Sequence, residues 1–229
     1  MIQNPPGQPP DYELAYRGES AFGEQMPWDI PGPQPAYVEV EQAGLINGEI
    51  LDCGCGTGEN ALFLAGKGYA VTGVDLSPTA VAQARRKATE RGIDATFAVA
   101  DALELTGYEG RFDTVVDSGM AHVFRPGELA RYTAALHGAC RRNAVVHVLG
   151  INEHRATEGL LADVVAKLGR NDPVTDARLM PMITVDALRT AFADGWTVES
   201  IRETPMHAVL PLTGAPTEVP GLLARITRT

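Results

Sequence analysis

The sequence is poor in cysteine and has no long hydrophobic run. Its 229 residues include three cysteines, too few for a disulfide framework, and Cys53 and Cys55 are too close in sequence to bridge without strain. We therefore expect reduced thiols. No stretch reaches the about 18 apolar residues of a membrane span, and the N-terminus lacks the basic-then-apolar pattern of a signal peptide. These absences predict a cytoplasmic protein that has no membrane partner.

Positive charge is also scarce. The chain has 19 Lys and Arg against 29 Asp and Glu, and its formal net charge is -10. Because such a field repels phosphate backbones, we expect no nucleic acid partner. The hydrophobic share of 45% and the charged share of 21% are ordinary for a globular protein, and the length suits one domain.

Proline is concentrated near the N-terminus. Half of the 16 prolines fall at or before Pro35, which excludes a regular helix or a central strand over most of this segment. The same segment carries more aromatic surface than a solvated linker holds. These aromatic residues are Tyr12, Tyr16, Phe22, Trp28 and Tyr37. Residues 1–37 are therefore expected to pack over the rest of the chain, either as a lid or as a plain structural strap.

From Gly48 onward, short apolar runs alternate with helical stretches. We expect strands at 49–52, 70–75, 96–101, 112–117, 144–151, 197–203 and 222–227. The β-α-β alternation predicts a parallel sheet, and the last connection is too short for a crossover helix. Ser77 followed by Pro78 is typical of a helix start. The expected fold is α/β, a doubly wound, Rossmann-like seven-stranded sheet, mostly parallel with an antiparallel C-terminal edge strand.

Two apolar stripes recur at helical spacing on either side of the fifth expected strand, and we interpret both as core. They are Leu129, Tyr132, Leu136 and Cys140 before it, and Leu160, Leu161, Val164, Val165 and Leu168 after it.

Glycines at alternate positions follow the first expected strand. Residues 51–58 read Leu-Asp-Cys-Gly-Cys-Gly-Thr-Gly. Glycine allows a tight turn and close approach to a ligand, while the following helix N-terminus offers free N–H groups to an anion. The spacing is G-x-G-x-G, whereas a dinucleotide site uses G-x-G-x-x-G. It therefore favours a carboxylate-bearing nucleoside, with an ordinary tight turn as the structural alternative.

Two acidic residues end the next expected strands. Asp75, after the second strand, can accept both hydroxyl protons of a ribose, and Asp101, after the third, is placed to accept from an adenine amino group. Each alone could be a helix cap. Together with the glycine loop, they predict a nucleoside site at one edge of the sheet.

From about Glu49 to Asp117, these residues resemble the class I S-adenosylmethionine-dependent methyltransferases. The resemblance implies S-adenosylmethionine as cofactor, S-adenosylhomocysteine as product, and a methyltransferase domain over residues 38–229. The loop 52–58 would lie against the methionine part, Asp75 would hold the ribose, and Asp101 with Ala102 would frame the adenine. The implied cofactor contacts are Trp28, Asp52, Gly54, Cys55, Gly56, Gly58, Asp75, Leu76, Asp101, Ala102, Asp117 and Ser118.

The arm and the tail are similar to a narrower group. Residues 16–23 (YRGESAFG), 27–30 (PWDI), 33–36 (PQPA) and 192–201 (FADGWTVESI) resemble thiopurine methyltransferase-like enzymes, especially actinobacterial methyltransferases of heterocyclic toxins and quinolones. The resemblance implies a small-molecule substrate and places Trp28 over the cofactor. Residues 151–182 depart from the group's pattern, which leaves the substrate open.

His122 is the candidate catalytic base. It follows the fourth expected strand, at the carboxyl edge of the sheet where the methyl group should point, and a histidine suits proton transfer near neutral pH. The alternative is a histidine that packs under Phe124 and only shapes the pocket. His147 lies in an expected buried strand and is interpreted as structural, while His154 is a second, weaker candidate.

Missing motifs narrow the chemistry. The fourth strand leads into Asp-Ser-Gly-Met rather than the Asn/Asp-Pro-Pro-aromatic tetrad of amino-base methylation, and residues 151–153 (Ile-Asn-Glu) lack the Asp-Asn pair of catechol-type enzymes, so we expect no metal. We expect methylation of a small heterocyclic or phenolic molecule in a pocket lined by Phe22, Trp28 and Phe124, with oxygen favoured and nitrogen or sulfur possible. The alternatives are an NAD-dependent oxidoreductase and a protein that binds S-adenosylmethionine without methylating.

Overall fold

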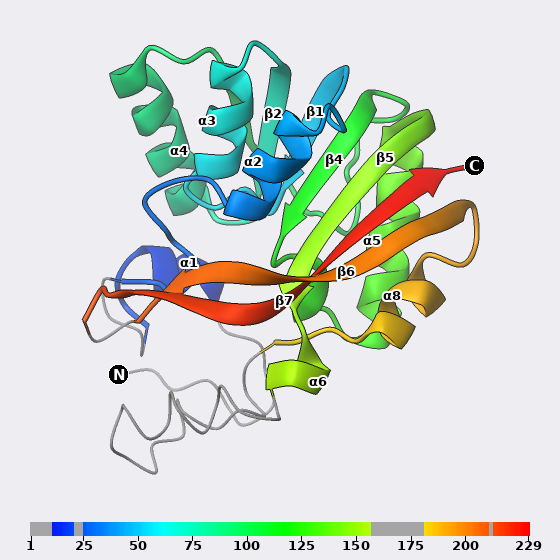
Figure 1. Cartoon of the computed structure of the whole chain (residues 1–229). Helices are drawn as coiled ribbons and strands as arrows, with labels where there is room; N and C mark the ends of the chain where they lie inside the picture. Colours follow the sequence, from blue (N-terminus) through cyan, green and yellow to red (C-terminus); the bar gives the residue numbers. More distant parts are fainter. Residues whose placement is uncertain (1–10, 21–24, 157–180, 211–212) are drawn as a thin grey trace.

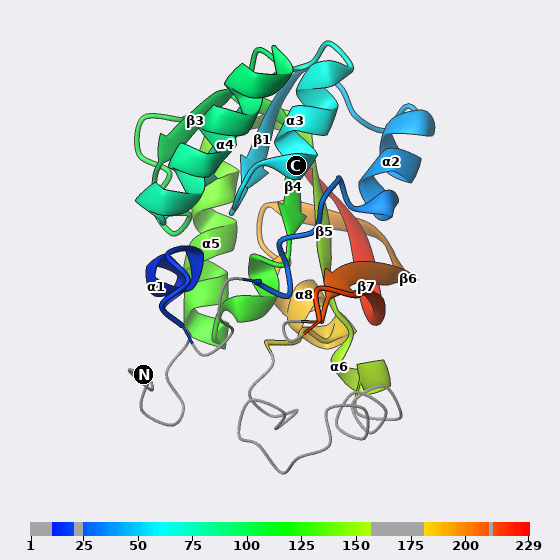
Figure 2. The ribbon, with the colours of Figure 1, turned by 90° about the vertical axis from the view of Figure 1, so that its left-hand side faces the viewer.

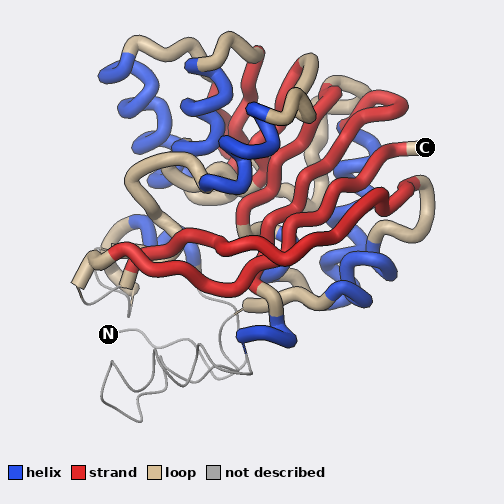
Figure 3. Tube along the Cα trace, viewed as in Figure 1, coloured by secondary structure: helices blue, strands red, loops and turns tan. Residues whose placement is uncertain are grey.

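The computed structural model describes residues 11–20, 25–156, 181–210 and 213–229. Its strands form one seven-stranded sheet in the order β3-β2-β1-β4-β5-β7-β6, drawn in red in Figure 3. Their bounds are β1 Glu49–Cys53, β2 Ala70–Asp75, β3 Thr96–Val99, β4 Phe112–Ser118, β5 Cys140–Ile151, β6 Trp196–Val209 and β7 Pro216–Arg228. Strands β1 to β5 are parallel, and β7 is antiparallel to both β5 and β6.

Helices cover both faces of this sheet. Their bounds are α1 Tyr12–Tyr16, α2 Pro35–Gln42, α3 Glu59–Gly66, α4 Pro78–Arg91, η1 Ala121–Val123, α5 Pro126–Ala139, α6 Glu153–Arg155 and α8 Val185–Ala191. Helices α2, α3 and α4 lie on one face, and α5 and α8 on the other (Figures 1 and 2). Each face has its own apolar cluster, so the core has two layers separated by the sheet.

The expected α/β fold is confirmed, with differences in detail: β5, β6 and β7 are longer than expected. The antiparallel C-terminal strand β7 lies between β5 and β6, so β6 forms the edge of the sheet. Strand β3 ends at Val99, before the expected end at Asp101. The start of α4 is as expected, because the Ser77 hydroxyl accepts a hydrogen bond from the Ala80 N–H at 3.0 Å and Pro78 is its first residue.

Leu129, Tyr132 and Leu136 are buried on α5, as expected of core residues. Cys140 is also buried and begins β5, and all three cysteines are free. The second apolar stripe, from Leu160 to Leu168, lies outside the described residues, as does Phe22. Among the helices that the structure describes, none combines the length and the apolar character needed to cross a membrane.

The described residues of the N-terminal arm form the short helix α1 and then lead into the core. Asp11 caps α1 by accepting a hydrogen bond from the Leu14 N–H at 3.1 Å. Tyr37 belongs to α2, is fully buried, and donates its hydroxyl hydrogen to the Asp117 carbonyl oxygen at 2.5 Å. The boundary expected at residue 37 therefore falls inside α2, and the part of the arm that lies on the surface of the core precedes Pro35.

Candidate active site

The glycine loop joins β1 to α3 through three residues in the left-handed region. Gly54, Gly56 and Gly58 have φ values of 73°, 53° and 90°. A Cβ on Gly54 would stand 2.7 Å from the Met120 sulfur, and one on Gly58 would stand 2.9 Å from the Ala84 Cβ. Glycine is therefore required here both for the backbone conformation and for the close approach of neighbouring segments.

Asp75, at the end of β2, holds this loop in place. One carboxylate oxygen accepts a hydrogen bond from the Gly56 N–H at 2.9 Å, and the other accepts one from the Ser77 N–H at 2.9 Å. Burial raises the pKa of this carboxyl group. Since a carboxylate has about four acceptor positions, both oxygens keep the capacity to accept ribose hydroxyls.

The arm packs directly on the glycine loop. The Trp28 indole N–H donates to the Tyr16 hydroxyl at 3.0 Å, and that hydroxyl lies 2.6 Å from the position of a Cβ on Gly56. The Thr57 hydroxyl donates to the Asp29 carboxylate at 2.5 Å. Burial, and then the charge of Asp75, raise the pKa of the Tyr12 hydroxyl to about 12.

A small cavity of about 50 Å³ lies between the arm and the loop. It is lined by Tyr16, Trp28, Asp29, Ile30, Gly32, Gln34, Ser118 and residues 54–60. Ligand pockets are usually about 300 Å³ or larger. The cavity between the arm and the loop is therefore small beside an ordinary ligand pocket.

Two buried acids lie under the loop. Burial raises the pKa of Asp52 and of Asp117 to about 7 in each case. One Asp52 oxygen accepts from the Ala61 N–H at 3.0 Å, and the other has no hydrogen-bond partner among the described residues. The Asp117 carboxylate accepts from the Met120 N–H at 2.7 Å and from the Tyr132 hydroxyl at 2.8 Å. Asp117 therefore fixes the turn after β4, and its expected contact with the cofactor stays a prediction.

His122 lies on η1, directly after that turn. Its Nδ1 accepts a hydrogen bond from the Ile151 N–H of β5 at 3.0 Å. Burial lowers its pKa to about 4. The imidazole is therefore neutral at physiological pH. Phe124 packs its ring against Tyr132, with centroids 5.1 Å apart.

The remaining expected contacts surround this centre. Cys55 and Ser118 line the cavity. Leu76 is 65% exposed next to Asp75, an apolar surface of the kind on which a flat base packs. Asp101 accepts from the Leu103 N–H at 2.8 Å, as in a local turn, and Ala102 is buried in the core. The contacts of Tyr16 and Asp29 with the glycine loop depend on the packing of the arm, which no local sequence pattern predicts.

The other histidines are placed differently. His147 is buried, its Nε2 lies 3.1 Å from the Leu45 carbonyl oxygen, and burial lowers its pKa to about 4, which agrees with a structural role. The His154 backbone N–H donates to the Asn152 side chain at the start of α6. In the described part of the chain, no cluster of three or more His, Cys, Asp or Glu side chains is arranged to hold a metal ion. The absence of a metal stays a prediction.

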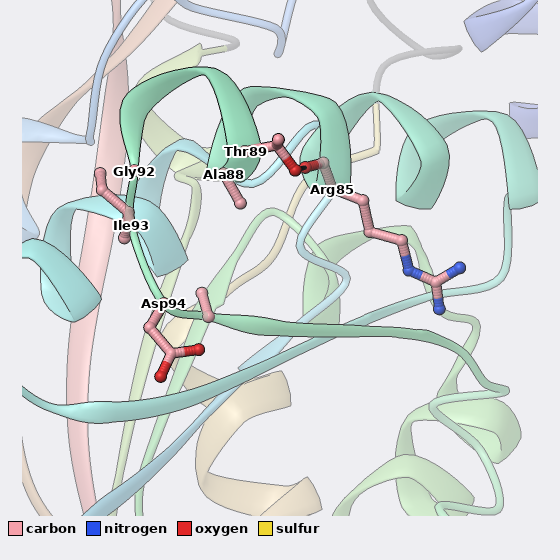
Figure 4. Close-up of a pocket in the computed structure, with 7 residues that line it drawn as sticks. Arg85, Ala88, Thr89, Gly92, Ile93 and Asp94 are labelled. Carbon is pink, nitrogen blue, oxygen red and sulfur yellow. Dashed lines mark hydrogen bonds between the residues drawn. The ribbon is translucent and has the colours of Figure 1, made fainter.

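A larger hollow of about 410 Å³ lies elsewhere, beside the C-terminal end of α4 (Figure 4). Arg85, Thr89 and Asp94 are among its lining residues. It lies at the amino end of β3, whereas ligands of such sheets bind outside the carboxyl ends of the strands. None of the expected site residues lines it.

Comparisons with known proteins agree with this geometry. A family model described as "Methyltransferase domain" matches residues 50–143. The chain is 36% identical over 182 residues to a 2-heptyl-1-hydroxyquinolin-4(1H)-one methyltransferase of Mycobacteroides abscessus, a match that covers 73% of this chain and 80% of the relative. The chain belongs to the class I S-adenosylmethionine-dependent methyltransferases.

Two solved structures are also similar to this methyltransferase. One, described as "Conversion of a Disulfide Bond into a Thioacetal Group during Echinomycin Biosynthesis", is 51% identical, has a TM-score of 0.84, and covers 95% of this chain and 90% of its own. The other, an S-adenosylmethionine-dependent methyltransferase from Anabaena variabilis, is 16% identical with a TM-score of 0.75 over 95% of this chain and 93% of its own, which shows the shared fold. The oxidoreductase alternative is thereby set aside.

The residues of this methyltransferase fit its family's cofactor. Gly56 lines the cavity without a Cβ, Asp75 holds the Gly56 N–H, and one buried Asp52 oxygen has no hydrogen-bond partner among the described residues. Together they offer close backbone approach and acceptors for hydroxyl and ammonium hydrogens. These are the features that S-adenosylmethionine requires.

Proposed function

We propose that this methyltransferase acts on a small heterocyclic molecule and that the nucleophile is an oxygen bonded to or conjugated with the ring. The observation that carries the proposal is the 36% identity over most of the chain to an enzyme named for a hydroxyquinolinone substrate. The aromatic side chains of Tyr16 and Trp28 beside the glycine loop support it, because a flat molecule packs well against such rings.

A second candidate is a disulfide sulfur. It is favoured by the 51% identity to the protein whose structure is described as converting a disulfide bond into a thioacetal group. A sulfur acceptor needs no proton removed before methyl transfer. The two candidates therefore share one requirement, which is precise alignment of a nucleophile with the methyl group.

The chain's own residues provide that alignment. Bound S-adenosylmethionine supplies an electrophilic methyl group on a sulfonium sulfur. Asp75 holds the ribose while it also fixes Gly56, so cofactor position and loop geometry depend on the same carboxylate. The arm, fastened to the loop through Asp29 and Thr57, excludes water when it closes over both ligands.

The test is an acceptor panel with two readouts, released S-adenosylhomocysteine and the mass of the product. The panel contains an N-hydroxyquinolone, the same ring system without its N-hydroxyl group, and a cyclic disulfide. We expect a product one methyl group heavier from the N-hydroxyquinolone only. Methylation of the disulfide alone would replace the first candidate by the second, and no S-adenosylhomocysteine release with any acceptor would contradict both.

A further inference from the structure

The ring nitrogens of His122 have different roles, and the structure distinguishes them. The Ile151 backbone N–H points at Nδ1 over 3.0 Å, and a backbone N–H can only donate. Nδ1 must therefore present its lone pair, and in a neutral imidazole the proton then sits on Nε2. Strand β5 thus fixes the tautomer through a residue 29 positions further along the chain.

The surroundings of the ring keep it in this neutral form. Burial lowers the pKa of His122 to about 4, and no charged group contributes to this shift. Beside Gly119 and Gly150, the described residues that share space with the imidazole are the apolar Met206 and Ile183. Ile151 contributes its backbone N–H.

The Nε2 edge is available to a ligand. Within the described part of the chain, Nδ1 is the only ring nitrogen of His122 with a hydrogen bond, and the residue keeps partial exposure. A Cβ on Gly119 would stand 3.3 Å from Nε2 and 3.3 Å from the Met206 methyl carbon, so a side chain at position 119 would cover this edge. Gly119 directly follows Ser118, which lines the cavity beside the glycine loop.

We propose that His122 donates a hydrogen bond from Nε2–H to an oxygen of the methyl acceptor and thereby selects acceptors whose nucleophile is already ionised. The inference rests on the proposed function and names the substrate class more closely. A nitrogen that carries a hydrogen has no lone pair to accept a proton, so His122 in this tautomer is not the general base that its position suggested. A charge-assisted hydrogen bond to an anionic oxygen favours the deprotonated acceptor and orients it.

Two substitutions distinguish the hydrogen-bond donor at Nε2 from the hydrogen bond that the Ile151 N–H makes to the same side chain. His122→Asn keeps an oxygen that can accept from the Ile151 N–H, but it lacks a donor at the place of Nε2. His122→Gln extends an amide N–H towards that place. We expect kcat/KM for the N-hydroxyquinolone to fall by about 10- to 100-fold in His122→Asn, mainly through KM, the loss that corresponds to one charge-assisted hydrogen bond. His122→Gln should recover most of it.

His137→Asn is the matched control, because His137 lies at the end of α5 against Trp196 and should leave both constants unchanged. A nitrogen NMR spectrum of histidine-labelled wild-type enzyme reads the tautomer directly. We expect a protonated Nε2 whose signal moves when the acceptor is added with S-adenosylhomocysteine. We also expect the wild-type rate to follow the ionisation of the acceptor, without a histidine pKa near neutrality.

The outcomes distinguish this inference from the proposed function. If the wild type methylates the N-hydroxyquinolone and His122→Asn does so equally well, the donor role is wrong and the proposed function stands. A proton on Nδ1, or a rate that falls as a histidine protonates between pH 6 and 7 as expected for an unperturbed imidazole, would also overturn the donor role. If only the disulfide is methylated, both are wrong, because that acceptor has no anionic oxygen.

Discussion

Glu13 fastens the arm to the core, and its removal tests whether the arm is a closing element. One Glu13 oxygen accepts from the Ser77 hydroxyl at 2.5 Å and from the Thr79 N–H at 3.2 Å, and the other accepts from the Thr79 hydroxyl at 2.6 Å. These donors lie at the N-terminus of α4, where a negative charge is favourable. The free energy of three such hydrogen bonds is reduced by partial solvent exposure. Together they stabilise the closed form, in which the arm lies on the core, by about 2 kcal/mol. Glu13→Ala should therefore weaken closure by about 30-fold.

Hydrogen exchange of residues 12–19 measures this change. The Arg17, Gly18 and Glu19 N–H groups bond to carbonyl groups within α1, and a helix of five residues does not persist once it leaves the core. Protection of these amides should fall by about the same factor as closure. Glu19→Ala is the matched control, since Glu19 pairs only at the surface with Arg17, with both side chains 52% exposed. Unchanged exchange in Glu13→Ala would refute the reasoning.

The attachment of the arm through Glu13 should depend on pH in a defined direction. Burial alone would raise the pKa of Glu13. The hydrogen bonds from Ser77 and Thr79 together lower it by more than burial raises it, so the pKa lies below its ordinary value of 4.5. A carboxyl group whose pKa is lowered by folding stabilises the closed form above its ordinary pKa and loses that effect as pH falls through the lowered value. The difference in protection between wild type and Glu13→Ala should therefore be full at neutral pH and disappear in acid.

Three further predictions concern the cofactor, the core and the arm as a whole. Asp75→Asn should weaken S-adenosylmethionine binding by about 10- to 100-fold in calorimetry, since charge-assisted bonds to the ribose are lost, and an unchanged affinity would remove Asp75 from the site. Tyr37→Phe should lower the free energy of unfolding in urea by about 1–3 kcal/mol, because the buried Asp117 carbonyl loses its donor; an unchanged midpoint would contradict this. Deletion of residues 1–28 should leave a folded core by circular dichroism and abolish turnover, and full activity of the truncated chain would show that the arm is a strap.

Much of the fold follows from local sequence signals. The apolar runs predict β1, β2 and β4 closely, and Ser77 with Pro78 predicts the start of α4, because capping and strand patterning act over a few residues. The place of β7 does not follow in this way. Its insertion between β5 and β6 depends on pairing such as Val148 with Ala224, between strands far apart in sequence.

In the candidate site, too, the features set by local sequence can be predicted and those set by long-range contacts cannot. The glycine loop and Asp75 follow from one motif and one strand end, and the structure places them together. The role of Asp117 could not be predicted from the local sequence, because its hydrogen-bond partners include Tyr132 on α5. The tautomer of His122 depends on a backbone N–H of β5, and no local pattern around residue 122 predicts it.

Methyl transfer from S-adenosylmethionine to a small heterocycle can be followed directly with cofactor that carries a trideuterated methyl group. The full-length enzyme is incubated with this cofactor and an N-hydroxyquinolone, and both products are quantified by mass spectrometry. We expect one labelled methyl group on the acceptor oxygen for each S-adenosylhomocysteine released, and a far slower reaction in Asp75→Asn at the same cofactor concentration. Release of S-adenosylhomocysteine without label on the acceptor, or no release at all, would contradict this expectation.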